Sequence, residues 1–98
     1  MRMLLKVQLP VAKANEAIQA GELQKAFESV LSKLHPEAAY FTVEGGKRTA
    51  LIVFDMASQA QMPVIGEPLF LALDAAIDLT PVMTQEDLQQ GLAQAFGD

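Results

Sequence analysis

Cysteine is absent from this 98-residue chain, and histidine occurs once, as His35. Without cysteine there are no disulfides, thiolate metal ligands or cysteine nucleophiles. A single histidine excludes a metal site built from several imidazoles of one chain, and it leaves a Ser-His-Asp triad only one possible base. The sequence also has no phosphate loop or dinucleotide fingerprint. We therefore expect neither a metal nor a cofactor.

Long hydrophobic runs are also lacking. No segment approaches the ~20 apolar residues of a membrane span. The apolar stretch behind Arg2 ends at Lys6, which is too short for a secretory signal peptide. Together with the absence of cysteine, these features predict a cytoplasmic protein that has no membrane partner.

Basic residues are scarce and unevenly placed. The 7 Lys and Arg face 12 Asp and Glu, which gives a formal net charge of −5. All the bases lie between Arg2 and Arg48, whereas residues 50–98 carry acids and no base. Negative charge, without a basic cluster among aromatics, argues against nucleic-acid binding. The asymmetry either averages out in the folded chain or provides complementary charge across a subunit interface.

The 98 residues, 51% of them hydrophobic, fit one domain spanning 1–98. Alternating apolar residues over 3–9 predict a strand with one face on a core. An apolar stripe over 12–34 predicts a helix that Gly21 kinks or divides in two. That helix ends at His35, because Pro36 disfavours helical geometry at the residue before it.

Two strands over 38–44 and 48–56 are predicted to form a hairpin. Gly45-Gly46 is a loop of the kind that supplies positive φ angles at little steric cost. If the loop consists of those two residues alone, Glu44 lies opposite Lys47, and the rest of the register follows by counting back from the loop.

A second helix follows Ser58, which is a plausible N-cap. Three residues limit this helix to a couple of turns, with a further turn after the last of them: Pro63, Gly66 and Pro68. Residues 75–82 then form a fourth strand.

A last helix covers about 85–96, and Thr84 followed by Asp87 resembles a capping box at its start. Its apolar stripe packs either on the same subunit or over a neighbour. The stripe consists of Leu88, Leu92 and Phe96.

The order of elements favours a ferredoxin-like α+β fold: a βαββαβ four-stranded antiparallel sheet with both helices on one face, plus a C-terminal helix. The sheet face away from the helices is too apolar to stay in water, because it carries Leu4, Tyr40, Leu51 and Val53. A second sheet from another copy would cover it. The sequence therefore predicts a homodimer, or a higher homo-oligomer, built as a dimeric α+β barrel.

Three segments, which follow one another in the right order and at similar spacing, carry a resemblance: Leu4-Leu5-Lys6-Val7 running into Leu9-Pro10, Val53-Phe54-Asp55, and Pro68-Leu69-Phe70 ahead of Ile77-Asp78-Leu79. In these the chain resembles the muconolactone isomerase group of dimeric α+β barrels. It departs from that group at His35-Pro36-Glu37-Ala38, where the isomerase has a longer segment rich in aromatics and arginine. The resemblance implies a bacterial relative of this superfamily rather than the isomerase itself, and it carries over only Lys6, as a polar residue of the barrel face.

Polar residues on that face are the candidate site for a small anionic or carbonyl metabolite. Lys6 is a candidate for stabilising an enolate, and Asp78 or Asp55 for moving a proton. The candidate ligand-binding residues are Gln8, Tyr40, Thr42 and Thr80. The alternative is a polar ladder in which Lys6 pairs with Asp78.

Other polar groups also have two interpretations. His35 is either a general base or a complement to the helix dipole. Asp55 is either catalytic or a cap of the second helix. For the protein as a whole, one hypothesis is an enzyme: an isomerase, a lyase or a cofactor-free oxygenase. The other is a non-enzymatic metabolite-binding or purely structural oligomeric module.

Overall fold

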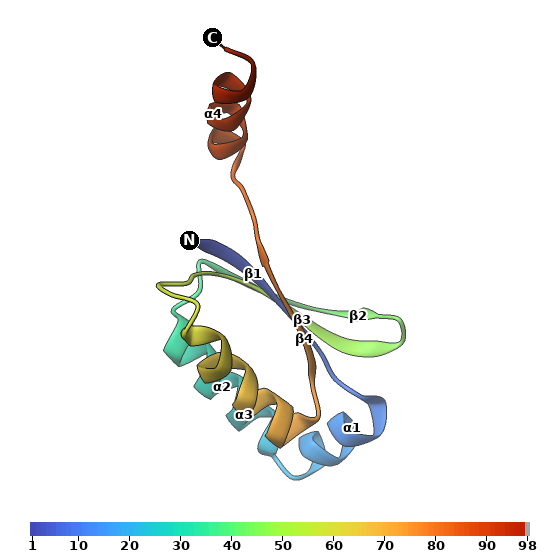
Figure 1. Ribbon diagram of the computed structural model, residues 1–98. Coiled ribbons are helices and arrows are strands. Elements are labelled where there is room, and N and C mark those ends of the chain that lie inside the picture. The colour runs from blue at the N-terminus through green and yellow to red at the C-terminus, as the bar shows by residue number, and fades with distance from the viewer. Residues whose placement is uncertain (98) are drawn as a thin grey trace.

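The computed structural model describes residues 1–97, which form an antiparallel sheet and four helices (Figure 1). The elements along the described chain are β1 (Arg2–Gln8), α1 (Val11–Gln19), α2 (Glu22–Leu34), β2 (Ala38–Glu44), β3 (Lys47–Asp55), α3 (Gln61–Leu73), β4 (Ala76–Pro81) and α4 (Gln85–Phe96).

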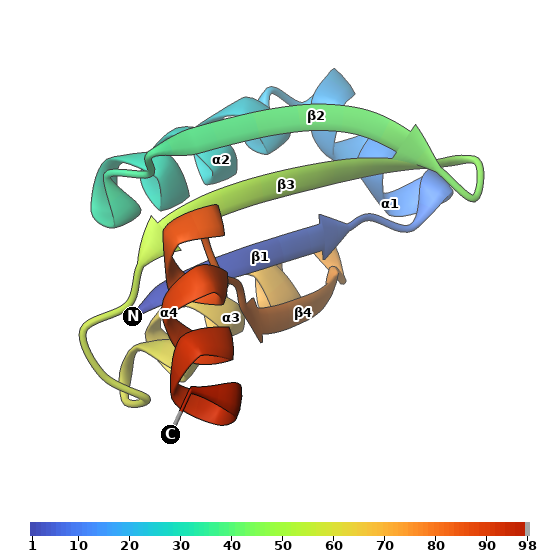
Figure 2. The ribbon, with the colours of Figure 1, turned by 90° about the horizontal axis from the view of Figure 1, so that it is seen from above.

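The four strands form one open sheet in the order β2-β3-β1-β4, and every neighbouring pair is antiparallel. The helices α1, α2 and α3 all lie on the same face of this sheet (Figures 1 and 2). The predicted α+β class, with four antiparallel strands, is confirmed. The arrangement is also consistent with a ferredoxin-like fold, since β2 and β4 each follow a helical crossover, while β1 and β3 lie side by side at the centre of the sheet.

The hairpin between β2 and β3 has the predicted register. Gly45 and Gly46 adopt φ angles of 60° and 76°, which side chains with a Cβ rarely adopt. Glu44 pairs with Lys47, so Tyr40 pairs with Leu51. This two-residue turn determines which side chains of both strands share a face.

The predicted first helix is divided in two, as expected, at Gly21. The second part, α2, ends at His35, which has a φ angle of 45° and donates its backbone N–H to the carbonyl of Leu31 at 3.1 Å. A left-handed residue at this position is a common way to end a helix. The following Pro36 prevents the helix from continuing.

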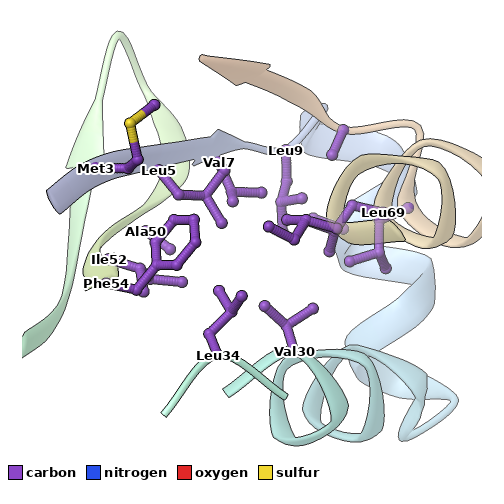
Figure 3. Packing of buried hydrophobic residues seen from close by; sticks show 14 of the residues in the cluster. Met3, Leu5, Val7, Leu9, Val30, Leu34, Ala50, Ile52, Phe54 and Leu69 are labelled. Carbon is purple, nitrogen blue, oxygen red and sulfur yellow. The ribbon is translucent and has the colours of Figure 1, made fainter. Parts of the chain in front are cut away.

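The core lies between the sheet and the three helices on its covered face (Figure 3). Alternate residues of the two central strands point into it, and each is at most 2% exposed: Met3, Leu5 and Val7 from β1, with Ala50, Ile52 and Phe54 from β3. From the helices, Val30 and Leu34 of α2 meet Leu69 of α3 across this layer. Apolar residues that recur every second position in the strands and every three or four positions in the helices therefore pack into one core.

The prediction for the second helix was wrong in length and starting point. The helix α3 runs for 13 residues and begins at Gln61, with Ala60 rather than Ser58 at its N-cap. Pro63 lies in the first turn, where the backbone N–H has no helical partner to lose. Pro68 lacks the backbone N–H that would donate to the carbonyl of Val64, and Val64 is exposed to water.

Burial of an apolar stripe explains why α3 persists through Pro68. Ile65, Leu69 and Leu73 repeat every four residues and are at most 6% exposed. Gly66 lies against β4, where an added Cβ would be 3.0 Å from the Cδ1 atom of Ile77. Glycine therefore lets helix and strand approach closely, and packing outweighs the low helix propensity of these residues.

The helix α4 spans the predicted residues and stands away from the sheet on the side opposite α1, α2 and α3 (Figures 1 and 2). Every residue of α4 is exposed. Its predicted capping box is present: the Thr84 N–H donates to Asp87 Oδ2 at 3.1 Å, and the Asp87 N–H donates to Thr84 Oγ1 at 3.2 Å. The N-terminus of α4 is thus stabilised by its own capping box rather than by packing against the sheet.

Replacing Thr84 by alanine should loosen α4 without unfolding the core. Hydrogen bonds from Thr84, and more weakly the charge of Arg2, hold the pKa of Asp87 below its usual range. A lowered pKa means that the cap is complete above the ordinary Asp value of about 3.9 and is lost as the pH falls through the lower value. In the variant, NMR titration should show the pKa of Asp87 closer to its ordinary value, together with faster amide exchange in the first turn of α4. An unchanged titration would contradict this role for the cap.

Candidate functional site

The sheet face opposite α1, α2 and α3 is the candidate site, and we call it the open face. Strand register puts the predicted residues on it: Leu4, Lys6, Gln8, Tyr40, Thr42, Leu51, Val53, Asp78 and Thr80. The helices α1, α2 and α3 lie on the other side of the sheet, and α4 stands away from it (Figure 1). Tyr40 is 66% exposed, and the apolar side chains of the central strands are half-buried by their neighbours alone. The open face is therefore apolar and uncovered in the single chain.

Lys6 lies in the centre of the open face, with Leu51 and Asp78 as its cross-strand neighbours. Its Nζ nevertheless forms an ion pair with Glu44, which lies beyond β3 at the end of β2. The Gln8 side-chain amide donates to the backbone oxygen of Glu44 at 3.0 Å. These bonds tie the hairpin end of β2 to β1.

The pairing of Lys6 with Asp78, considered from the sequence, is therefore not the one that forms. Register places their Cα atoms side by side, but a lysine stem is long enough to carry its ammonium across a neighbouring strand. Asp78 lies on the exposed edge strand β4, where water can solvate its carboxylate. The Lys6 side chain thus leans toward β2.

The predicted ligand-binding residues are spread over the full width of the sheet. Tyr40 and Thr42 lie on the edge strand β2, whereas Thr80 lies on the opposite edge strand β4, and Gln8 lies between them on β1. Three strand spacings of ~4.8 Å separate the two edges by about 14 Å. One small molecule on the flat face cannot touch both edges, so these residues can converge only if another layer covers the face.

Asp55, the second candidate for proton transfer, lies away from Lys6. It is opposite Arg2 at the far end of β3, four residues along the strand from the partner of Lys6. Its Oδ1 accepts a hydrogen bond from the Met1 amino group at 2.6 Å. That bond and the positive charge of the amino group, with a smaller contribution from Arg2, lower the pKa of Asp55, which makes it a weaker base. Asp55 also does not cap α3, which begins at Gln61.

Two other places carry polar side chains: the end of α2 and the hairpin. His35 is an exposed residue at the C-terminal end of α2. At the hairpin, Glu44 is paired with Lys6, while Arg48 donates from Nη1 to the Asn15 side-chain oxygen at 2.8 Å. Within residues 1–97, no three His, Asp or Glu side chains come close enough to hold a metal ion.

A second concave surface, which the sequence reasoning missed, lies on the helix side of the sheet near the hairpin. We call it the Phe41 groove; its volume is about 330 Å³, and it is lined by Leu9, Ile18, Leu23, Gln24, Phe27, Phe41, Thr42, Arg48, Thr49 and Ala50. The Phe27 and Phe41 rings meet edge to face with their centroids 5.8 Å apart. Phe41 is nevertheless 62% exposed.

A signal for this groove existed in the sequence. Phe41 and Val43 are apolar residues on the covered side of β2, but the strand extends past the helices that cover it, and Val43 is 71% exposed. Only the relative lengths and positions of the elements in space reveal that overhang. A smaller depression of about 140 Å³ lies between α2 and α3.

No family model, curated protein or solved structure matches this chain. Among residues 1–97, no helix is both long and apolar enough to cross a membrane. The geometry of the chain itself therefore carries the functional argument.

Proposed function

We propose that the protein is a homodimer in which two open faces pack against each other and enclose a site for a small anionic or carbonyl metabolite. The observation that carries this proposal is the uncovered apolar sheet face around Lys6. Leu4, Leu51 and Val53 surround a polar centre there; neighbouring side chains half-bury them, and α4 stands away from the sheet (Figure 1). Exposed contiguous apolar patches of this kind mark interaction sites.

A second copy suits this face because a sheet is the natural cover for a sheet. Two sheets packed face to face lie about 10 Å apart, with the side chains of both inner faces between them. Tyr40 and Asp78, which lie on opposite edges of one sheet, can then contribute to the same enclosed space from different copies. Enclosure also lowers the local dielectric, which strengthens the effect of the Lys6 charge on a ligand.

Within that space we propose isomerase- or lyase-type chemistry, in line with the resemblance to the muconolactone isomerase group. Asp78 removes a proton from the carbon next to a carbonyl, and the electron pair moves onto the carbonyl oxygen. The Lys6 ammonium stabilises the resulting enolate, and the protonated Asp78 returns its proton to another carbon. Absence of cysteine and the same resemblance support a reducing bacterial cytoplasm as its location.

The second candidate function is a non-enzymatic module that binds a metabolite or only assembles. The ion pair between Lys6 and Glu44 favours it, since a cation that already has a carboxylate partner needs no ligand to balance its charge. Gln8, which also binds Glu44, extends the same polar network.

Native mass spectrometry of the purified protein, under conditions that retain bound metabolites, tests the proposal. We expect a dimer that carries a small acid or carbonyl compound. Replacing Lys6 by alanine should reduce the bound fraction at least tenfold, whereas the matched change at Lys33, an exposed residue of α2, should leave it unchanged. A ligand-free dimer would support the structural module, and a monomer would contradict both candidate functions.

A further inference from the structure

The apolar stripe of α4 is largely exposed in residues 1–97. Leu88 is 45% exposed, Leu92 is 48% exposed and Phe96 is 85% exposed. Among residues 1–97, the only ion pair between α4 and the rest of the chain is a 3.9 Å approach of Asp87 to Arg2. We infer that α4 of one copy seats this stripe in the Phe41 groove of a second copy.

The groove of the same chain is out of reach for α4. The chain leaves the sheet at Pro81, beside Met3, whereas Leu9 at the other end of β1 lines the groove. Six residues of strand separate those two ends by about 20 Å, so the three-residue link before α4, which spans at most about 10 Å, would have to turn the helix back along the strand. The sheet itself also intervenes, because α4 leaves on the open-face side and the groove is on the helix side (Figure 1).

Shape and chemistry match between the two surfaces. Leu88, Leu92 and Phe96 repeat every four residues and span about 12 Å along one side of α4. Amphipathic helices dock in apolar grooves through such a row of anchors. The groove offers an apolar floor with the partly exposed Phe41 ring at its side, so both surfaces would lose unfavourable contact with water.

Charge favours a second copy as the occupant. The α4 segment carries Glu86 and Asp87 and no base. Arg48 lies at the groove, and its bond there is to a neutral partner, Asn15. Among residues 1–97, no carboxylate lies within ion-pairing distance of Arg48. Attraction between the acidic α4 of one copy and Arg48 of a second copy would thus give the unequal charge of the two halves of the chain a physical role.

This inference rests on the proposed function only for the presence of a second copy. The helix α4 would dock on the helix side of the partner's sheet, whereas the proposed chamber forms between the two open faces. One contact can therefore fail while the other persists, and each contact has its own readout.

Site-specific crosslinking tests the exchange, and the cysteine-free chain makes every product assignable. Gln24→Cys places a thiol in the groove, and Ala95→Cys places one beside the stripe without removing an anchor. The two variants, with different affinity tags, are co-expressed so that only a link between chains joins the tags. A short bis-maleimide should join them at least tenfold more efficiently than it joins either matched control pair.

The control pairs move one thiol at a time. Gln90→Cys lies on the opposite side of α4 from the stripe, and Ser32→Cys lies on α2 away from the groove. Equal yields in all pairs would overturn the inference, as would a double variant, Gln24→Cys with Ala95→Cys, that links only within one chain. A ligand-bearing dimer without the specific crosslink would contradict only the docking of α4 in the Phe41 groove of a second copy. A ligand-free protein that forms the crosslink would contradict only the proposed function.

Discussion

Replacement of Val53 by glutamate is expected to convert the proposed dimer into a monomer that keeps its fold. Val53 lies on the open face opposite Leu4 and is half-buried in the single chain. In the free chain the new carboxylate can reach water, but between two packed sheets it would be buried without a partner. That burial costs several kcal/mol per ion. At about 1.4 kcal/mol per tenfold, dimerisation should weaken by roughly a hundredfold or more.

Light scattering on a size-exclusion column, over a range of protein concentrations, measures this effect. The matched control is Val11→Glu, because Val11 is 52% exposed and begins α1, where an acidic side chain complements the helix dipole. The control should remain dimeric. Circular dichroism should show the same fold in both variants. A Val53→Glu protein that stays dimeric at the concentrations of the parent would rule out pairing of the open faces.

Replacement of Leu5 by alanine is expected to lower the free energy of unfolding by about 2–5 kcal/mol. Leu5 is fully buried in β1, where it lies beside Ile52 and Leu79 on the covered side of the sheet. The change removes buried methyl groups and leaves a cavity that rigid strands on both sides cannot close. The total free energy of unfolding of a domain is roughly 5–15 kcal/mol, so this change would remove much of its stability.

Urea unfolding at one fixed protein concentration is the appropriate measurement, since dimerisation would make stability depend on concentration. Leu71 provides the matched control, because it is a leucine of α3 that is 83% exposed. Its change to alanine should alter the free energy of unfolding by no more than about 0.5 kcal/mol. Equal effects at the two positions would mean that the sheet and helices do not share the core described above.

The open face and the Phe41 groove together give the single chain two unpartnered apolar surfaces on opposite sides of one sheet. A third, the stripe of α4, stands apart from both. Self-association through the open face would form the proposed chamber, and exchange of α4 would fasten two copies together. Both proposals attribute the exposed apolar side chains to contacts between copies of the chain.

Local signals predicted most of the fold correctly. Gly45-Gly46 determines the hairpin register, because few residues other than glycine adopt positive φ angles in a two-residue turn. Gly21 and His35 likewise mark the ends of helices, and Thr84 with Asp87 marks the start of the last one. In each case the deciding interactions lie within a few residues along the chain.

The second helix could not be predicted in the same way. Proline and glycine propensities predicted a couple of turns with a further turn after Pro68, whereas burial of Ile65, Leu69 and Leu73 holds all 13 residues in one continuous helix. The compensation comes from residues distant in sequence, such as Ile77, against which Gly66 packs. Local propensity is a weak guide when a continuous apolar stripe meets a preformed sheet.

The candidate site was likewise predicted in part from the sequence. Period-two alternation and the hairpin count were enough to place Lys6, Tyr40 and Asp78 on one face, because side chains of a strand alternate strictly. Sequence alone did not reveal that Lys6 pairs with Glu44 across β3, or that every residue of α4 is exposed. Nor did it reveal the overhang of β2 that opens the Phe41 groove. Those features depend on the reach of a long side chain and on the relative lengths and directions of elements, which only the assembled tertiary structure sets.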